Sequence, residues 1–186
     1  LQYIFEYQSM ISELNGMECT NASMYDGATA TAEAMFMMVA SAKKKNRVVI
    51  SGTVADRVIN VVKTYAKFRG IDLTVAPEKD GVSDFDAIKA ELEAGDVAGV
   101  IVATPNKYGI VEDYTGYADA IHAAKGMLAI NADPSALAVL RTPKEWGADI
   151  ACGDGQSLGM PLCFGGPYLG YMSCSSATLR KMPGRV

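Results

Sequence analysis

The hydrophobic positions near the start of the chain recur with the period of a helix. Over residues 2–14 the apolar side chains fall on one side of a helix, and Gly16 stands where a C-terminal cap would. A turn over residues 21–27 precedes an Ala- and Met-rich helix that runs to about Lys45, with Asp26 as its N-cap. Because this second helix is nearly uncharged, we expect it to be buried on most sides, with its methionines filling the core.

From residue 47 onward, short apolar strands alternate with helices. The predicted strands cover residues 47–52, 71–77, 97–104, 127–132, 147–152 and 169–175, and the predicted helices cover residues 53–68, 84–93, 117–124 and 136–140. Thr53 is expected to cap the first of these helices, and Gly70 to follow its end. This alternation predicts an α/β fold, a three-layer α/β/α sandwich with a mostly parallel sheet.

The length of 186 residues suits a single domain over residues 1–186. The chain opens with Leu1 rather than Met inside a helix pattern, and its last residues resemble mid-domain sequence. We therefore expect a fragment of a longer protein.

Composition narrows the function classes. A net charge of -4 gives no support for nucleic-acid binding, and no apolar stretch reaches the ~20 residues that cross a bilayer. The one basic run, residues 43–45, is expected to complete a helix dipole. The four cysteines show no zinc spacing, so no metal site is predicted, and Cys152 and Cys174 are expected to be buried thiols in a reducing compartment.

Ligands of parallel sheets bind at the carboxyl ends of the strands. In this chain that edge would collect residues 52–53, 104–106, 133–135 and a glycine loop, residues 153–167. The glycine loop has five glycines, which let backbone approach a ligand or a second chain closely. It contains no Lys, His, Arg or Glu, and Cys163 is its only candidate nucleophile. The sequence thus predicts a site-shaped loop without a catalytic group of its own.

Common catalytic motifs do not fill this gap. The segment at the end of the first predicted strand, residues 51–56, contains only one glycine, Gly52, which argues against a dinucleotide fingerprint and a P-loop. His122 lies mid-helix without a second base nearby, so we expect a surface or packing role. Asp133, just past a buried strand, has two open interpretations. It is either the partner of a pyridoxal ring nitrogen or the N-cap of the helix that Pro134 begins, and spacing alone favours the cap.

Four segments carry a family resemblance: residues 22–30 (ASMYDGATA), 132–137 (ADPSAL), 147–150 (GADI) and 153–170 (GDGQSLGMPLCFGGPYLG). They resemble the P-protein family of the glycine cleavage system, glycine dehydrogenase (decarboxylating), and within it subunit 1, the N-terminal or α half. The resemblance runs over essentially the whole chain. It implies the large domain of a fold-type I pyridoxal phosphate protein, with an N-terminal segment and the small C-terminal domain absent from this sequence.

The resemblance also implies that only the second half of the family carries the cofactor lysine. Alignment of the glycine loop with that half places Gly155 at a ring-stacking histidine and Gln156 at the Schiff-base lysine. An amide cannot form a Schiff base. At the implied phosphate cup, Asp26 would repel a phosphate group. The resemblance therefore implies no catalytic residue and no cofactor in this chain, with pyridoxal 5'-phosphate held by the partner subunit.

What the family implies instead is a partner's role. The assembled heterotetramer would decarboxylate glycine and pass the aminomethyl group to the lipoyl arm of H-protein, in the cytoplasm of a bacterium or archaeon. The isolated chain is expected to be inactive. The residues that could contribute to a shared site are Ser23, Met24, Tyr25, Asp26, Asp133, Gln156, Gly165, Gly166 and Pro167. Two alternatives stay open: a self-sufficient pyridoxal phosphate enzyme, such as an aminotransferase or cysteine desulfurase with Lys107 as its amine, and a purely structural interaction domain.

Overall fold

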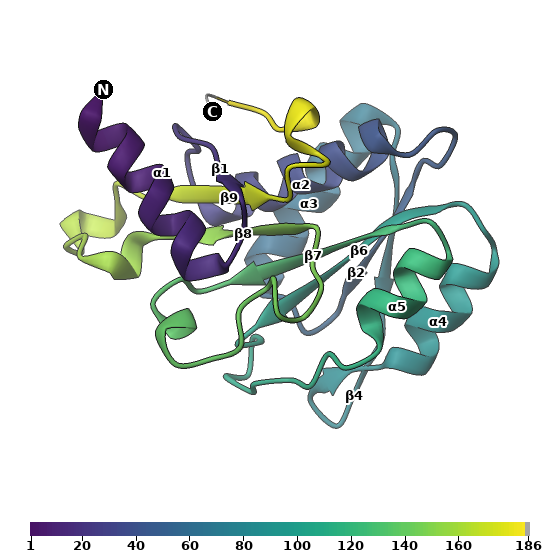
Figure 1. Cartoon of the computed structure of the whole chain (residues 1–186). Coiled ribbons are helices and arrows are strands. Elements are labelled where there is room, and N and C mark those ends of the chain that lie inside the picture. Colours follow the sequence, from purple (N-terminus) through teal and green to yellow (C-terminus); the bar gives the residue numbers. More distant parts are fainter. Residues whose placement is uncertain (185–186) are drawn as a thin grey trace.

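A seven-stranded sheet with the order β1-β9-β8-β7-β6-β2-β3 organises the computed structural model, which describes residues 1–184 (Figure 1). Its strands are β1 (Cys19–Thr20), β2 (Arg47–Ser51), β3 (Asp72–Ala76), β6 (Val97–Thr104), β7 (Met127–Ala132), β8 (Ile150–Asp154) and β9 (Gly170–Cys174). The five strands from β8 to β3 are parallel, whereas β9 and β1 run antiparallel at the edge. The prediction of a mostly parallel sheet is confirmed.

Helices cover both faces of this sheet, as expected for three layers. They are α1 (Gln2–Asn15), α2 (Gly27–Ser41), α3 (Asp56–Arg69), α4 (Phe85–Glu93) and α5 (Tyr117–Ala123). Figure 1 shows α2 and α3 on one side of the sheet and α1, α4 and α5 on the other. Each face has its own apolar cluster, one built on α2 and α3 and one on α1, α4 and α5.

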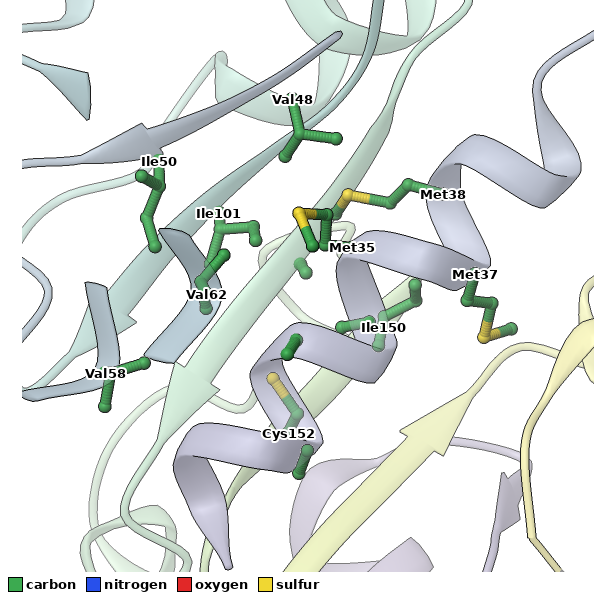
Figure 2. Packing of buried hydrophobic residues seen from close by; sticks show 14 of the residues in the cluster. Met35, Met37, Met38, Val48, Ile50, Val58, Val62, Ile101, Ile150 and Cys152 are labelled. Carbon is green, nitrogen blue, oxygen red and sulfur yellow. The ribbon is translucent and has the colours of Figure 1, made fainter. Parts of the chain in front are cut away.

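The buried helix predicted from the Ala- and Met-rich segment is confirmed as α2. Its residues Met35, Met37 and Met38 are at most 1% exposed, and Figure 2 shows them in the cluster that also contains Val62 and Ile101. Gly99 of β6 lies directly beneath this helix, since a Cβ there would come 2.4 Å from the Met38 sulfur. The close approach of α2 to the sheet fixes the position of its N-terminus over the carboxyl ends of the strands.

The prediction that Thr53 caps the following helix is wrong. Helix α3 begins at Asp56 and its N-cap is Ala55, which makes no side-chain hydrogen bond to the helix. The Thr53 hydroxyl is buried and hydrogen-bonds instead to the hydroxyls of Ser51 (2.9 Å) and Ser83 (3.0 Å). Pattern alone could not reveal these competing hydroxyls, because Ser83 is contributed by the distant strand β5 (Val82–Ser83).

The basic run at residues 43–45 also has a different role from the predicted one. Helix α2 ends at Ser41, so these lysines lie beyond its last turn. The Lys45 ammonium donates to the carbonyl oxygens of Val97 (3.1 Å) and Ala124. Ala124 is the C-cap of α5, so the Lys45 ammonium hydrogen-bonds to a carbonyl at the C-terminal end of a helix on the other face of the sheet.

Two other elements depart clearly from their predicted bounds, and three short strands were not predicted. The strand predicted over residues 147–152 is β8, Ile150–Asp154, because Gly147 turns the chain with a φ of 77°. The helix predicted over residues 136–140 is a single 3₁₀ turn, Ala136–Ala138. The two-residue strand β1 and the hairpin of β4 (Glu78–Lys79) and β5 (Val82–Ser83) are too short to give a periodic signal.

Glu18 ties the edge of the sheet to two neighbouring segments. Its carboxylate accepts from Ser176 N, just after β9, and from Lys144 Nζ at 3.0 Å. These hydrogen bonds, the one from the Ser176 backbone first, lower the pKa of Glu18 to about 2.

We predict that this carboxylate makes stability depend on pH under acidic conditions. A carboxyl with a lowered folded-state pKa contributes stability above its unfolded pKa of 4.5 and loses it as the pH falls toward about 2. Glu18→Gln should therefore lower the melting temperature near neutral pH, and the gap to the parent chain should close over that acidic window. Melting curves against pH test this, with Glu93→Gln on α4 as the control. An equal gap at every pH would contradict it.

Candidate functional site

The carboxyl ends of the central strands open into a cleft with a volume of about 1090 Å³. Its floor comes from the ends of β6, β7 and β8, and its walls from the first turns of α2 and α3. The lining residues that bear charged or polar side chains are Asp26, Asp56, Arg57, Asn106, Lys107, Tyr108, Asn131, Asp133, Asp154, Gln156, Ser157 and Tyr168. Carboxylates outnumber cationic groups at this edge, where the sequence predicted the ligand site.

Asp26 is the N-cap of α2, as the sequence predicts. Its carboxylate accepts from Thr29 N at 2.7 Å, and the Thr29 hydroxyl accepts in turn from Asp26 N at 3.3 Å, which completes a capping box. The backbone N–H of Gly27, the first residue of α2, donates to a second carboxylate, Asp154 Oδ2, at 3.2 Å. The first turn of α2 therefore faces two acidic side chains of its own chain.

Asp154 joins α2 to the glycine loop. Besides holding Gly27 N, its carboxylate accepts from Gln156 N at 2.9 Å. The charge of Asp154 also reaches helix α1, where burial first and this carboxylate second raise the pKa of Tyr7 to about 12. Sequence reasoning missed Asp154 because the predicted strand ended at Cys152, two residues before it.

Asp133 lies on the cleft and organises the turn that follows β7. Its Oδ1 accepts from Ser135 N (3.0 Å), from the Ser135 hydroxyl (2.6 Å) and from the Ser157 hydroxyl (2.8 Å). Partial burial acts to raise the pKa of Asp133, but these hydrogen bonds outweigh it and hold the pKa below the usual value. The predicted N-cap role is wrong, because the 3₁₀ turn Ala136–Ala138 has Ser135 as its N-cap. The Asp133 carboxylate instead closes the turn that precedes it, while it also borders the cleft.

Gln156 begins the exposed part of the glycine loop, two residues past the end of β8. Its side chain lines the cleft and donates from Nε2 to the Pro167 carbonyl at 3.2 Å. Gly165, Gly166 and Pro167 are not part of the cleft lining and lie in the outer part of the loop. Its tip bears the exposed Cys163 and a fully exposed Phe164.

The turn before α2 lies beside the cleft rather than in its lining. Met24 forms an isolated antiparallel bridge to Gly170, the first residue of β9. Ser23 has a left-handed φ of 73°, and the Tyr25 side chain is 85% exposed. The structure therefore places Asp26, Asp133 and Gln156 in one cleft, and Ser23 and Tyr25 at the surface next to it, with Met24 partly buried between them.

Two cationic side chains line the cleft: Lys107, which the sequence offered only as the amine of an alternative enzyme, and Arg57, which it did not single out. Lys107 is the one lysine that lines the cleft among residues 1–184, and its ammonium pairs with Glu78 (3.1 Å) and Asp56 (3.5 Å). The hydrogen bond to Glu78 contributes most to raising the pKa of Lys107. The order of β6 beside β2 is what brings this lysine to the start of α3, and topology of that kind is not readable from spacing.

His122 and the buried cysteines have the structural roles predicted for them. His122 Nε2 lies 2.8 Å from Asp149 Oδ2, and neither residue lines the cleft. Cys152 and Cys174 are fully buried, and burial raises the pKa of the Cys152 thiol to about 12. Over residues 1–184 no helix is long and apolar enough to cross a membrane, and no three His, Cys, Asp or Glu side chains gather as metal ligands would.

Comparison with known proteins gives matches over the whole chain. The family model "Glycine cleavage system P-protein" matches residues 1–186. Probable glycine dehydrogenase (decarboxylating) subunit 1 of Syntrophomonas wolfei is 45% identical over 186 residues, and that of Anoxybacillus flavithermus is 48% identical. Each alignment covers 100% of this chain but only 42% and 41% of the respective relative. The chain therefore spans about two-fifths of the length of these relatives.

Solved structures give the same result. The crystal structure of glycine decarboxylase (P-protein) of the glycine cleavage system, in inhibitor-bound form, matches with a TM-score of 0.91 and 39% identity, over 100% of this chain and 41% of that one. An alanine–glyoxylate aminotransferase from Nostoc matches with a TM-score of 0.71 at 18% identity, over 96% of this chain and 46% of that one. The second match shows a shared fold, that of fold-type I pyridoxal phosphate enzymes.

Proposed function

We propose that this chain, which belongs to the glycine cleavage system P-protein family, is the large domain of a glycine decarboxylase subunit that holds no cofactor of its own. In this proposal a second, lysine-bearing subunit binds pyridoxal phosphate, which supplies the electron sink for decarboxylation of glycine. The present chain supports that subunit and furnishes part of the wall of its site. H-protein accepts the aminomethyl group on its lipoyl arm.

The observation that carries the proposal is the side chain of Gln156. It stands where the fold leads the chain out of β8 and into the cleft, and it is an amide hydrogen-bonded to Pro167 O at 3.2 Å. An amide nitrogen is not nucleophilic, so it cannot bond covalently to an aldehyde cofactor. The residues present at this point do not fit pyridoxal phosphate.

Lys107 does not replace the missing amine. The side chain of Lys107 is 21% exposed, its ammonium already pairs with Glu78 and Asp56, and its raised pKa keeps it protonated at neutral pH. A Schiff-base lysine must instead lose its proton to become a nucleophile. This argues against the alternative of a self-sufficient enzyme of the same fold.

The surfaces beside the cleft suit contact with another subunit. Large apolar side chains that are more than half exposed lie on α1, on the turn before α2 and on the glycine loop: Tyr3, Phe5, Met10, Tyr25, Leu162 and Phe164. Exposed apolar groups of this size often mark protein interfaces. The proposed contributors Ser23, Met24, Tyr25, Gly165, Gly166 and Pro167 belong to the same turn and loop.

We predict that Gln156→Ala lowers the turnover of the reconstituted complex without preventing its assembly. Loss of the Pro167 hydrogen bond frees the start of the glycine loop, which would misplace the shared wall. We expect kcat/KM for glycine to fall about tenfold, which corresponds to a loss of about 1.4 kcal/mol of transition-state stabilisation. Release of labelled CO2 from carboxyl-labelled glycine measures this, with Gln2→Ala on α1 as the matched amide control. Unchanged kinetics in an intact complex would favour a purely structural domain.

The isolated chain provides the complementary test. It should release no CO2 from glycine, and pyridoxal phosphate added to it should not develop the visible absorbance of a lysine-bound cofactor. Either CO2 release or that absorbance from the isolated chain would overturn the proposal. For its compartment we propose the cytoplasm of a bacterium, because the four cysteines are free thiols and the relatives named above are bacterial.

A further inference from the structure

Two of the backbone donors at the N-terminus of α2 are engaged within the chain itself. The first N–H groups of a helix point outward along its axis and attract anions such as phosphate. In this chain Thr29 N is bound by Asp26 Oδ1 at 2.7 Å and Gly27 N by Asp154 Oδ2 at 3.2 Å. Two of the donors that an incoming phosphate would use are thus already hydrogen-bonded to carboxylates.

The same turn is also closed by packing. A Cβ on Gly27 would lie 2.6 Å from Asp154 N and 2.8 Å from the Gly153 carbonyl carbon, so the end of β8 presses directly on the helix. On the other side, a Cβ on Gly170 would lie 2.4 Å from Asp26 O. The segment that enters α2 is held between the end of β8 and the start of β9. Space beside Gly27 is too small for even a methyl group.

We propose that Asp154, together with Asp26, is a built-in anion at the N-terminus of α2 that excludes phosphate-bearing ligands from the cleft. The carboxylates stabilise the positive end of the helix, which is the role that a ligand phosphate would otherwise have. A phosphate with nearly two negative charges would have to displace them and would meet their repulsion.

Asp154 has a second task in this arrangement, as a positioning residue for the glycine loop. Its two oxygens hold Gly27 N and Gln156 N at once, so the loop begins from a point fixed to α2. The exclusion of phosphate and the placement of Gln156 therefore depend on one side chain. This extends the proposed function, from a chain that lacks a cofactor amine to a chain that actively occupies the anion site.

Inorganic phosphate tests the proposal without any cofactor. In Asp26→Ser/Asp154→Ala the serine still caps α2, while Gly27 N becomes free and both charges are removed. We expect phosphate to raise the melting temperature of this variant by about 3 °C more than chloride of equal ionic strength, at a concentration about tenfold above its Kd. The wild-type chain supplies the general salting-out baseline and should lack this extra rise.

The controls separate an open helix terminus from a general loss of charge. Asp133→Asn removes a carboxylate from the same cleft without freeing a donor of α2, and should match the wild type. If the double variant does not fold, Asp154→Ala alone keeps the Asp26 cap and should show a smaller rise. An equal rise in the wild-type chain or in Asp133→Asn, or none in the folded variants, would overturn the proposal. The phosphate experiment does not test the proposed subunit role. That role would be contradicted by a different result, release of CO2 from glycine by the isolated chain.

Discussion

Gly153→Ala is expected to lower the free energy of unfolding by about 3 kcal/mol, because the added methyl group has no room at the end of β8. A Cβ on Gly153 would lie 2.1 Å from the carbonyl oxygen of Ala132 on the neighbouring strand β7, and 3.0 Å from the ring of Tyr171. Backbone cannot yield as a flexible side chain can. The Tyr171 hydroxyl, buried and bonded to the same oxygen at 2.7 Å, would be displaced as well.

The change should also disturb the cleft, since Ala132 precedes Asp133 and Gly153 precedes Asp154. Denaturant unfolding measures the loss of stability, and Gly166→Ala serves as the control. Gly166 has an extended backbone with a φ of -164°, and a Cβ there would meet nothing within 4 Å. Stability of Gly153→Ala close to that of Gly166→Ala would show that β7 and β8 can separate locally, and would contradict this account.

The architecture was predictable where elements are long and their burial is uniform. Strand β6 reads as an uninterrupted apolar run, and all eight of its residues are buried on both faces of the sheet. Helix α2 is indicated by a good cap at Asp26 and by a nearly uncharged sequence, with Glu33 as its one charged residue. In both cases the local pattern and the tertiary environment agree, which is the condition under which sequence reasoning succeeds.

Boundaries failed where a distant partner decides them. Thr53 was a plausible cap, but its hydroxyl finds the buried serines of β2 and β5 instead. Lys45 follows α2 in the sequence, but its ammonium hydrogen-bonds to the Ala124 carbonyl at the end of α5. Each outcome depends on hydrogen-bond partners that the order of strands brings together, and nothing in a local window indicates them.

The candidate site divides in the same way. Its location at the carboxyl ends of the strands followed from the parallel sheet, and Asp26, Asp133 and Gln156 do line one cleft. Asp154 was missed, although it stands within the glycine loop as the sequence defines it. The available signal was a carboxylate directly after a buried strand, the same signal that singled out Asp133. Asp154 was not recognised because the predicted strand ended at Cys152, whereas β8 ends at Asp154.

The core beneath the cleft gives the second large effect, and Ile101→Ala should cost about 3–4 kcal/mol. Ile101 is fully buried at the centre of β6, pairs with Ile50 of β2 and belongs to the cluster beneath α2 that Figure 2 shows. Removing three carbons there leaves a cavity that close-packed neighbours can fill only in part.

The matched control for this change is Ile4→Ala on α1. Ile4 is 43% exposed, and alanine has the higher helix propensity, so the free energy of unfolding should change by less than about 0.5 kcal/mol. Because α2 carries both Asp26 and Gly27, a looser core beneath it should also loosen the first turn at the cleft. Hydrogen exchange of the Thr29 amide, which Asp26 holds, should accelerate in Ile101→Ala. Unchanged exchange together with the full loss of global stability would show that the capped turn opens independently of the core.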